Sequence, residues 1–345
     1  MTATASFVPA PALDTVASVL AEHAVETERE ARVAPESVEA LRAAGLFALG
    51  IPEADGGASV SGLLETLTQL GAACPASAWV TGTSAVSKRF AALAVDSEIA
   101  PPAIAPDAPA CGSGQPRGRL VGEGGEFRLE GRWQWISGCE IAEVAVLAAS
   151  TSEPDPASPL SAAIVPLDAL RIEPDWDVAG MRGTGSHAVV ADGVPVPPTH
   201  HAPIAFAATF VVFGAVSVAA PVLGAAAGAL ALARKRIGDS RAARAHALEA
   251  MQRVDDALLI ARAVAEEADL LGASVAMPDA TRLRSRLGRA VKAAVAAFDP
   301  ILDLHGATGF RSEQPVQRLW RDASVGSRHP LILGLGVDEQ YGEQL

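Results

Sequence analysis

The sequence is poor in the residues that mark several large classes of protein. Three cysteines occur in 345 residues, far apart and without a Cys-x-x-Cys pair. We therefore expect neither a disulfide framework nor a zinc site, and place the chain in a reduced, cytoplasmic setting. The first seven residues lack the basic-then-apolar order of a signal peptide. Aromatic residues amount to 4%, whereas half of the chain is hydrophobic and alanine is abundant, which favours packed helices over a β-sandwich.

Positive charge is scarce as well. The 27 lysines and arginines face 40 aspartates and glutamates, which gives a formal net charge of −13. This charge would repel a nucleic acid, so no nucleic-acid partner is expected. No Gly-x-Gly-x-x-Gly motif follows a predicted strand, and neither a Walker loop nor a Gly-x-Ser-x-Gly turn occurs. Without a nicotinamide site, the electrons for any redox reaction would have to come from outside the chain.

One segment has no charged residue over a length that could cross a bilayer. It runs from Ala202 to Ala233 and is followed by three basic residues. However, it consists mostly of small residues, and Pro203 and Pro221 interrupt it. Small residues suit a helix that other helices surround on all sides. We therefore expect a buried helix and no membrane association.

The residue pattern changes twice along the chain. Up to about residue 95 apolar residues recur at helical spacing, and a stretch rich in proline and alanine follows. Short segments such as Phe127 to Ile136 then alternate apolar and polar residues, which indicates strands. From about residue 205 only helical patterns remain. We predict a mostly α protein with an N-terminal helical domain (1–110), a central β-domain (111–204) and a C-terminal helical bundle (205–345).

Motifs along the chain resemble those of the acyl-CoA dehydrogenase superfamily, in the order in which that superfamily has them. None is specific by itself, but the ordered set extends over about residues 30 to 342. The resemblance implies an N-terminal helical domain, a small β-barrel or sandwich, a C-terminal four-helix bundle and a bound flavin. The matching segments are Arg32–Gly57, Gly131–Gly138, Gly180–Ser186, Ala233–Gly238, Leu302–Phe310 and the closing segment Arg318–Ile332.

Two positions depart from the dehydrogenases of this superfamily. Many of them place the catalytic glutamate nine residues after the arginine of an Arg-Asp-Ala step. Counted from Arg321, that position is Pro330, and its neighbour is His329. The alternative position lies on the helix predicted within Ala202–Ala233, which contains no acid. Dehydrogenation needs a carboxylate beside the substrate, so we expect the fold to be kept while the chemistry has changed.

A histidine at this place resembles the two-component flavin-dependent monooxygenases of the superfamily. This branch implies an oxygenase component that takes reduced FMN, or less often FAD, from a separate flavin reductase. It would oxidise a small aromatic or secondary-metabolite substrate with O2 and form a homotetramer. Two other functions stay open, namely an acyl-thioester dehydrogenase with a displaced base and a flavin-free, non-redox member of the fold.

His329 is the predicted catalytic residue, because imidazole titrates near neutral pH and can activate a substrate hydroxyl or nitrogen. The alternative is a structural histidine. Trp135 and Ser137, ahead of Trp133, are candidates for packing on the flavin ring and for hydrogen-bonding near its N5. Strand alternation would put these three residues on one face, and core packing is the alternative for one tryptophan.

Further site residues come from the resemblance alone. Arg234 resembles an arginine that reaches a flavin phosphate, often across a subunit boundary. The alternative is a solvated charge on a helix. Gly306 and Gly309 would let the backbone approach the same cofactor, or form a plain turn. Trp79 and Trp176 are possible walls of the substrate pocket, with core packing as the alternative for both. The neighbours Arg321 and Asp322 are predicted to form a structural ion pair.

Overall fold

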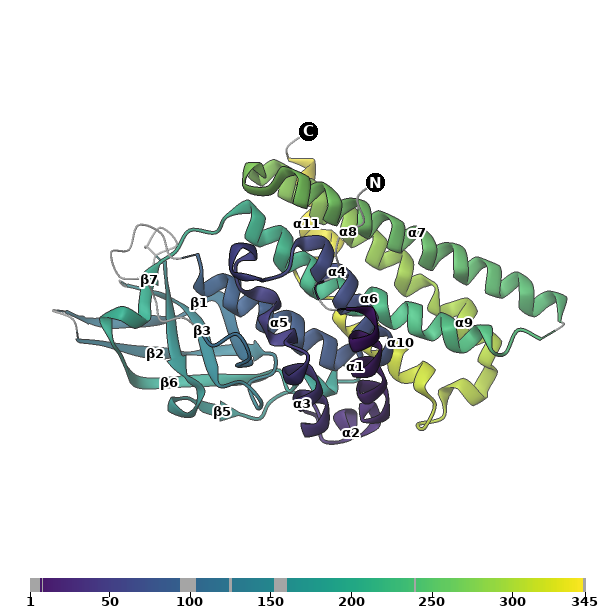
Figure 1. The fold of residues 1–345 in the computed structure, drawn as a ribbon, viewed down its shortest axis with the longest axis horizontal. Helices are drawn as coiled ribbons and strands as arrows, with labels where there is room; N and C mark the ends of the chain where they lie inside the picture. Colours follow the sequence, from purple (N-terminus) through teal and green to yellow (C-terminus); the bar gives the residue numbers. More distant parts are fainter. Residues whose placement is uncertain are drawn as a thin grey trace.

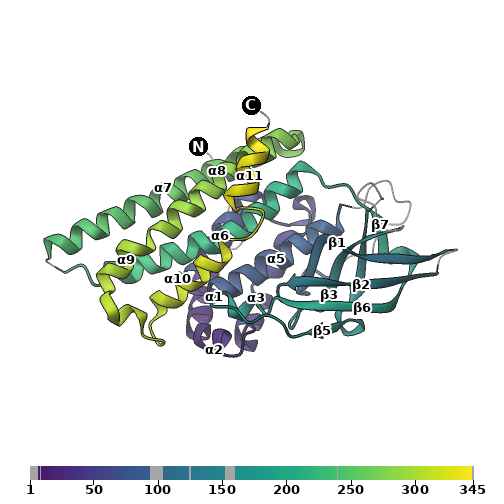
Figure 2. The ribbon, with the colours of Figure 1, turned by 180° about the vertical axis from the view of Figure 1, so that it is seen from behind.

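The molecule has a β-sheet at one end and long helices at the other (Figure 1). The structure, a computed structural model, describes residues 7, 9–93, 104–123, 126–151, 160–238 and 240–343. The view from behind shows the same arrangement, with α5 between the sheet and the C-terminal helices (Figure 2). The helix–strand–helix order along the chain thus corresponds to three parts of the fold, the N-terminal helices, the sheet and the C-terminal helices, which meet around α5.

The described N-terminal part is helical. Proline stands in the first turn of α1, α3 and α5, where its missing N–H removes no intrahelical hydrogen bond. Ser59 begins α4, since its side chain accepts a hydrogen bond from the backbone N–H of Gly62. The helices are α1 Ala10–Glu22, α2 Ala24–Arg29, α3 Pro35–Ala43, α4 Val60–Ala73 and α5 Pro75–Ala91.

The described strands form one mixed sheet in the order β5-β6-β2-β1-β3-β4-β7. β1 and β3 are parallel, and the other neighbouring pairs are antiparallel. The strands are β1 Ala110–Glu123, β2 Glu126–Ile136, β3 Val144–Ser150, β4 Leu160–Pro166, β5 Arg171–Glu173, β6 His187–Val196 and β7 His201–Pro203.

Both faces of the sheet are covered at β3, which explains why this strand is apolar from Val144 to Ala149. Leu147 packs in the core of the β-domain together with Trp133. Its neighbours Val146 and Ala148 point to the other face and pack with Phe90 of α5. A strand buried on both faces has no polar alternation. α5 is therefore fixed against the sheet.

The long apolar segment forms α6, which is the central helix of the C-terminal part. In its most apolar 18-residue window, 83% of the residues are buried, so the expected buried helix is confirmed. α4 crosses α6 closely: a Cβ added at Gly71 would lie 2.8 Å from Cα of Pro221. The helices of this part are α6 Ala208–Arg234, α7 Arg241–Leu271, α8 Met277–Ala296, α9 Phe298–His305, α10 Pro315–Gly326 and α11 Gly334–Gly342.

Candidate active site

A cavity of about 650 Å³ lies where the three parts meet, within the range of roughly 300–1,000 Å³ that is usual for small-molecule sites. Its wall combines α5, β1, the end of β2, the loop between β5 and β6, the start of α6 and the segment after α10. Five of the residues predicted from the sequence line it, namely Trp79, Trp135, Ser137, Trp176 and His329. The structure brings these residues together although they are spread over 250 positions of the chain.

The cavity contains almost no charge. Among the described residues that line it, none is aspartate or glutamate, and Arg328 and His329 are its only basic side chains. This is unusual in a chain with a net charge of −13. The wall therefore offers no carboxylate that could remove a proton from a bound substrate, and it favours ligands that are neutral or negatively charged.

Hydroxyl groups form a hydrogen-bonded chain in the cavity wall. Trp79 Nε1 donates to Ser137 Oγ at 3.1 Å. Ser137 Oγ lies 2.8 Å from Ser186 Oγ, which lies 2.7 Å from Thr184 Oγ1. Thr184 Oγ1 in turn donates to the carbonyl oxygen of Met181 at 2.8 Å. The chain thus runs from α5 through the end of β2 to the loop that precedes β6.

The direction of the hydrogen bonds in this chain follows from its last member. A carbonyl oxygen only accepts, so Thr184 donates its single proton there. The proton between Thr184 and Ser186 must then come from Ser186, and the proton between Ser186 and Ser137 must come from Ser137. Ser137 Oγ also accepts from the indole, which leaves it one lone pair. Toward a ligand, Ser137 is consequently an acceptor.

Two cavity residues have a left-handed backbone that side chains other than glycine rarely adopt. Trp135 has a φ of 62° and Met181 a φ of 55°. Backbone strain of this kind persists where the surroundings hold it and gathers at functional sites. Met181 is held from α10, because its N–H donates to Asp322 Oδ1 at 2.6 Å. The strained backbone of both residues therefore indicates that the cavity is a functional site whose wall is held in place by its surroundings.

The predicted alternation along β2 is wrong at its end. Trp133 is fully buried in the core of the β-domain and donates to the carbonyl oxygen of Ala148. Trp135 instead is 61% exposed at the cavity. The pairing of β2 with β6 shifts register between Trp133 and Ile136, where the positive φ of Trp135 breaks the two-residue period. Trp133 therefore packs in the core, which was the alternative to flavin binding for one of the tryptophans, and it does not line the cavity.

His329 lies in the turn between α10 and α11. Its ring meets the indole of Trp79 edge to face at 5.6 Å, and its Nδ1 accepts a hydrogen bond from the N–H of Leu331 at 3.3 Å. Burial, with a contribution from the positive charge of Arg284, lowers the pKa of His329 to about 4. The imidazole is therefore neutral at neutral pH, with its proton on Nε2.

The predicted ion pair of Arg321 with Asp322 is wrong. Arg321 instead pairs with Glu28 of α2 and donates to the carbonyl oxygen of Ala179. Asp322 is buried and accepts from the backbone of Met181. Burial raises the pKa of Asp322 to about 6, although that hydrogen bond opposes the rise. Neighbours on α10 point to different sides of the helix, which explains why they bind different partners.

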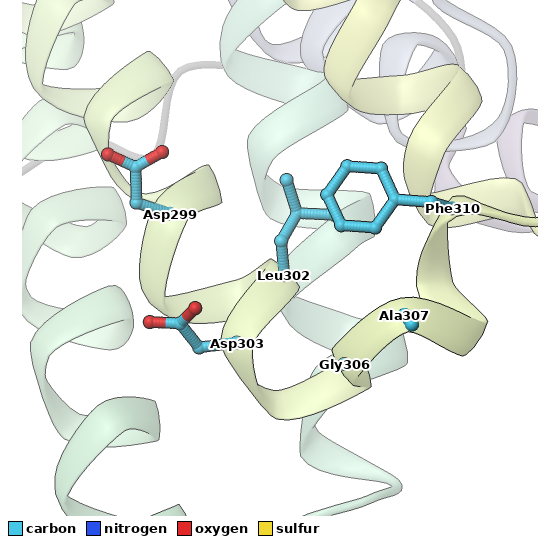
Figure 3. Close-up of a pocket in the computed structure, with 6 residues that line it drawn as sticks. All are labelled: Asp299, Leu302, Asp303, Gly306, Ala307 and Phe310. Atoms are coloured by element: carbon cyan, nitrogen blue, oxygen red, sulfur yellow. The ribbon is translucent and has the colours of Figure 1, made fainter.

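Besides Trp133, three further predicted flavin residues lie outside this cavity. Arg234 is exposed at the end of α6. Gly306 lines a second, smaller depression together with Asp299 and Asp303 of α9 and with Phe310, which follows that helix (Figure 3). Gly309 packs against His305, since a Cβ there would lie 2.6 Å from Cβ of His305. Within one chain, these three residues therefore do not lie at the cavity that contains His329.

Sequence reasoning missed an aromatic cluster in the cavity wall. Phe90 of α5 stacks on Phe206 at 5.7 Å with an interplanar angle of 9°, and Phe210 lies 5.8 Å from both rings. All three line the cavity. The segment before α6 gave no signal beyond its apolarity, and nothing in the sequence connects it with residue 90. Thr184, Ser186 and Arg328 were also missed, although they lie within quoted motifs.

The lining is compatible with a flavin ring. Trp135 presents an exposed indole on which a flat ring system can stack. Ser137 presents a lone pair, which suits the N5–H of a reduced flavin better than the unprotonated N5 of an oxidised one. No carboxylate among the described lining residues would repel a reduced, negatively charged ring. Arg328, exposed beside this wall, supplies the positive charge that a phosphate-bearing cofactor needs.

Comparison with known proteins identifies the class to which the chain belongs. Residues 10–96 match the N-terminal domain of acyl-CoA dehydrogenase and residues 216–332 its C-terminal domain. These matches place the chain in the acyl-CoA dehydrogenase family, and its similarity to named oxygenase subunits places it in the branch of flavin-dependent monooxygenases. The family and the branch predicted from the sequence are thereby confirmed.

Individual relatives specify that branch. The chain is 30% identical to the flavin-dependent monooxygenase oxygenase subunit HsaA of Rhodococcus jostii (strain RHA1), over 92% of each protein. It is 32% identical to the oxygenase component of the FADH2-dependent resorcinol hydroxylase of Rhizobium sp. (strain MTP-10005), over 96% of the chain and 92% of the relative. Among solved structures, XiaF from Streptomyces sp., in complex with FADH2 and glycerol, superimposes with a TM-score of 0.86 at 26% identity, covering 96% and 93%.

Proposed function

We propose that the chain is the oxygenase component of a two-component monooxygenase that hydroxylates a small aromatic substrate with reduced flavin and O2. One observation carries this proposal: the cavity has Pro330, with His329 beside it, where a dehydrogenase would need a carboxylate, and its described lining contains no acid. When bound, the reduced flavin supplies two electrons and activates O2, so that one oxygen atom enters the substrate and the other leaves as water.

The residues of the chain hold the cofactor and keep water away from it. When the flavin is bound, Trp135 would stack on its ring, and the remaining lone pair of Ser137 would accept a hydrogen bond from a reduced ring. Phe90, Phe206 and Phe210 form an apolar wall, and a site that excludes water limits side reactions that consume reduced flavin without forming product. FMN is the proposed flavin and FAD the alternative, since structural neighbours have been solved with FADH2 and with FMN.

An aromatic substrate is proposed for two reasons. The aromatic wall stacks favourably on another ring, and the names of several relatives state resorcinol, indole-3-acetate and p-hydroxyphenylacetate as the compounds on which they act. His329 and Trp79 stand at the same wall, so His329 hydrogen-bonds the substrate hydroxyl or nitrogen. Trp176, whose indole N–H donates to the carbonyl oxygen of Met181, forms the adjacent wall.

The partners follow from the same assignment. The relatives are named as oxygenase subunits or components, which supports a separate flavin reductase and, with it, a cytoplasmic location. A homotetramer is proposed because Arg234 and Gly306 lie outside the cavity and would act on the flavin of another copy. Exposed apolar residues on the outer helix α7 offer a surface for such contacts, namely Leu248, Leu259, Ile260 and Leu270. Light scattering after size exclusion should give the mass of four chains.

Anaerobic flavin binding tests the proposal against its two alternatives. The protein should bind reduced FMN or FAD more tightly than the oxidised forms, and butyryl-CoA should not reduce bound flavin. Reduction of the flavin by the thioester would support a dehydrogenase with a displaced base. A protein that binds neither flavin, with no shift of its melting temperature, would support a flavin-free member of the fold.

A further inference from the structure

Arg284 of α8 holds the turn that carries His329. Its Nε donates to the carbonyl oxygen of Leu331 at 3.1 Å, and its Nη2 donates to that of Pro330 at 3.4 Å. Its third donor, Nη1, lies 3.3 Å from Gln340 Oε1 of α11. A planar guanidinium with several fixed donors can bind two successive carbonyl groups in this way. One side chain thereby connects α8, the turn and α11.

The turn comes unusually close to α8 beside this arginine. A Cβ added at Gly288, one helical turn after Arg284, would lie 2.7 Å from the carbonyl oxygen of Ile332. Within the turn, the N–H groups of Ile332 and Leu333 both donate to the carbonyl oxygen of His329, at 3.0 and 2.9 Å. The position of the histidine backbone is therefore fixed by the same face of α8 that carries the guanidinium.

Arg284 and His329 are also linked through one peptide group. The Pro330 carbonyl that accepts from Arg284 belongs to the same peptide as the Leu331 N–H that donates to His329 Nδ1. A donor at the carbonyl polarises the peptide and strengthens its N–H as a donor. Nδ1 is thus kept as an acceptor, and the imidazole must carry its proton on Nε2, the nitrogen that remains available to the cavity.

The charges around the ring act in the same direction. From α8 the ring faces the positive charge of Arg284, and Arg328 of its own turn is exposed and donates to Ser327. Arg284 has no carboxylate partner among the described residues, because Asp338 of the neighbouring helix α11 accepts from Ser285 instead. No acid lies among the described residues that line the cavity. A positive charge on the imidazole ring, so close to that of Arg284, is therefore unfavourable, in agreement with the lowered pKa of His329.

We infer that Arg284 is a positioning residue that keeps His329 neutral with its proton on Nε2, so that His329 offers the substrate a hydrogen-bond donor and does not take up its proton. This inference rests on the proposed function for the role of His329. A neutral donor stabilises a negatively charged or electron-rich oxygen of a phenol without leaving a charged imidazolium in an apolar wall.

The test is a titration of the histidine ring in the protein without flavin or substrate. Nitrogen-15 NMR distinguishes protonated from unprotonated ring nitrogens, and the signals of His329 are identified among seven histidines by their loss in His329→Gln. We expect a protonated Nε2 and an unprotonated Nδ1, with no titration near neutral pH. Arg284→Gln should raise the titration midpoint by at least about one pH unit, toward the value near 6.5 of a free imidazole.

Two further variants make the result specific. Arg284→Lys keeps the charge and should retain most of the lowered midpoint. Arg286→Gln is the matched control, since Arg286 lies two residues away on α8, is exposed and pairs with Glu267, and it should leave the midpoint unchanged. A proton on Nδ1 in the unmodified protein, or an unchanged midpoint in Arg284→Gln, overturns the inference. Because neither flavin nor product is measured, such a result leaves the oxygenase proposal standing.

Discussion

The indole of Trp79 connects Ser137 and His329, which belong to two different parts of the chain. Its Nε1 donates to Ser137 Oγ at 3.1 Å at the end of β2, and its ring meets the His329 imidazole at 5.6 Å in the turn after α10. Trp79 itself belongs to α5, which packs on the sheet and on α6. The distance between the proposed flavin residue and the proposed catalytic residue is thus set by one rigid side chain.

Ser137→Ala should weaken the binding of reduced FMN and affect oxidised FMN less. Ser137 has one lone pair left for a ligand, and only the reduced ring has a proton on N5 to donate to it. Loss of this hydrogen bond should lower the affinity for reduced FMN about tenfold, which corresponds to about 1.4 kcal/mol. Anaerobic fluorescence titrations with the two redox forms measure the difference.

Trp79→Phe is the control for this experiment. It removes the indole N–H and keeps an aromatic ring of similar position, so Ser137 gains a free lone pair and reduced FMN should still bind. If Ser137→Ala weakened the binding of reduced and oxidised FMN equally, the deduced direction of the hydrogen bonds in the hydroxyl chain would be wrong. The serine would then only shape the cavity wall.

Replacement of the two tryptophans of β2 should have opposite effects. Trp133→Ala empties a fully buried position and should lower the free energy of unfolding by roughly 3–5 kcal/mol. Trp135→Ala removes an exposed ring from a strained backbone, so it should leave stability nearly unchanged and weaken flavin binding. Denaturant unfolding and flavin titration of both variants check this. Loss of flavin binding in the Trp133 variant at full stability would contradict our placement of the two rings.

His329→Ala should lower product formation far more than flavin affinity. A positioned hydrogen-bond donor at the reacting atoms contributes about 10²–10³-fold in rate, whereas the cofactor is held by other residues. His329→Gln should recover part of the rate, since its amide can donate as Nε2–H does. Single-turnover product yields with resorcinol as the probe give the comparison. Equal loss of flavin binding and product formation would instead assign His329 a structural role.

Asp322→Asn should change how stability depends on pH. Burial raises the pKa of Asp322 to about 6 in the folded protein, above its ordinary value of 3.8. Its contribution to stability is therefore complete below about pH 4 and is lost as the pH rises through about 6. At 1.36 kcal/mol per pKa unit, the loss is roughly 3 kcal/mol.

Asparagine cannot ionise, and its amide oxygen can still accept from the N–H of Met181. The free energy of unfolding of Asp322→Asn, measured between pH 4 and 8, should therefore lack this decline. The lowered pKa of His329 has the opposite effect, but it is shared by both proteins and cancels in the difference. Parallel stability curves for the variant and the unmodified chain would show that Asp322 stays ionised when folded.

Patterns that depend on periodicity predicted the fold well. The uncharged stretch became the buried helix α6 because small residues allow close crossings such as that of Gly71 with Pro221. The same reasoning failed where the backbone leaves its regular conformation. Strand alternation placed Trp133 and Trp135 on one face, and only the coordinates show that the φ of Trp135 is positive.

The candidate site was partly predictable for a related reason. His329, Ser137 and Trp135 stand within motifs whose order is preserved, so a resemblance could select them. The contacts of Phe90 with Phe206 and of Arg284 with the turn at His329 join segments far apart in sequence. Such contacts result from the packing of whole elements, and no local pattern encodes them.

The central claim is that this cavity directs O2 chemistry onto a substrate, and isotope labelling tests it most directly. The protein is supplied with FMN or FAD that has been reduced by light with EDTA as the electron donor, with 18O2 and, in separate reactions, with resorcinol, indole-3-acetate and p-hydroxyphenylacetate. We predict a hydroxylated product that carries one 18O atom from at least one of these substrates. Complete reoxidation of both flavins with reduction of the O2 to hydrogen peroxide, and no labelled product from any of the three substrates, would contradict the account.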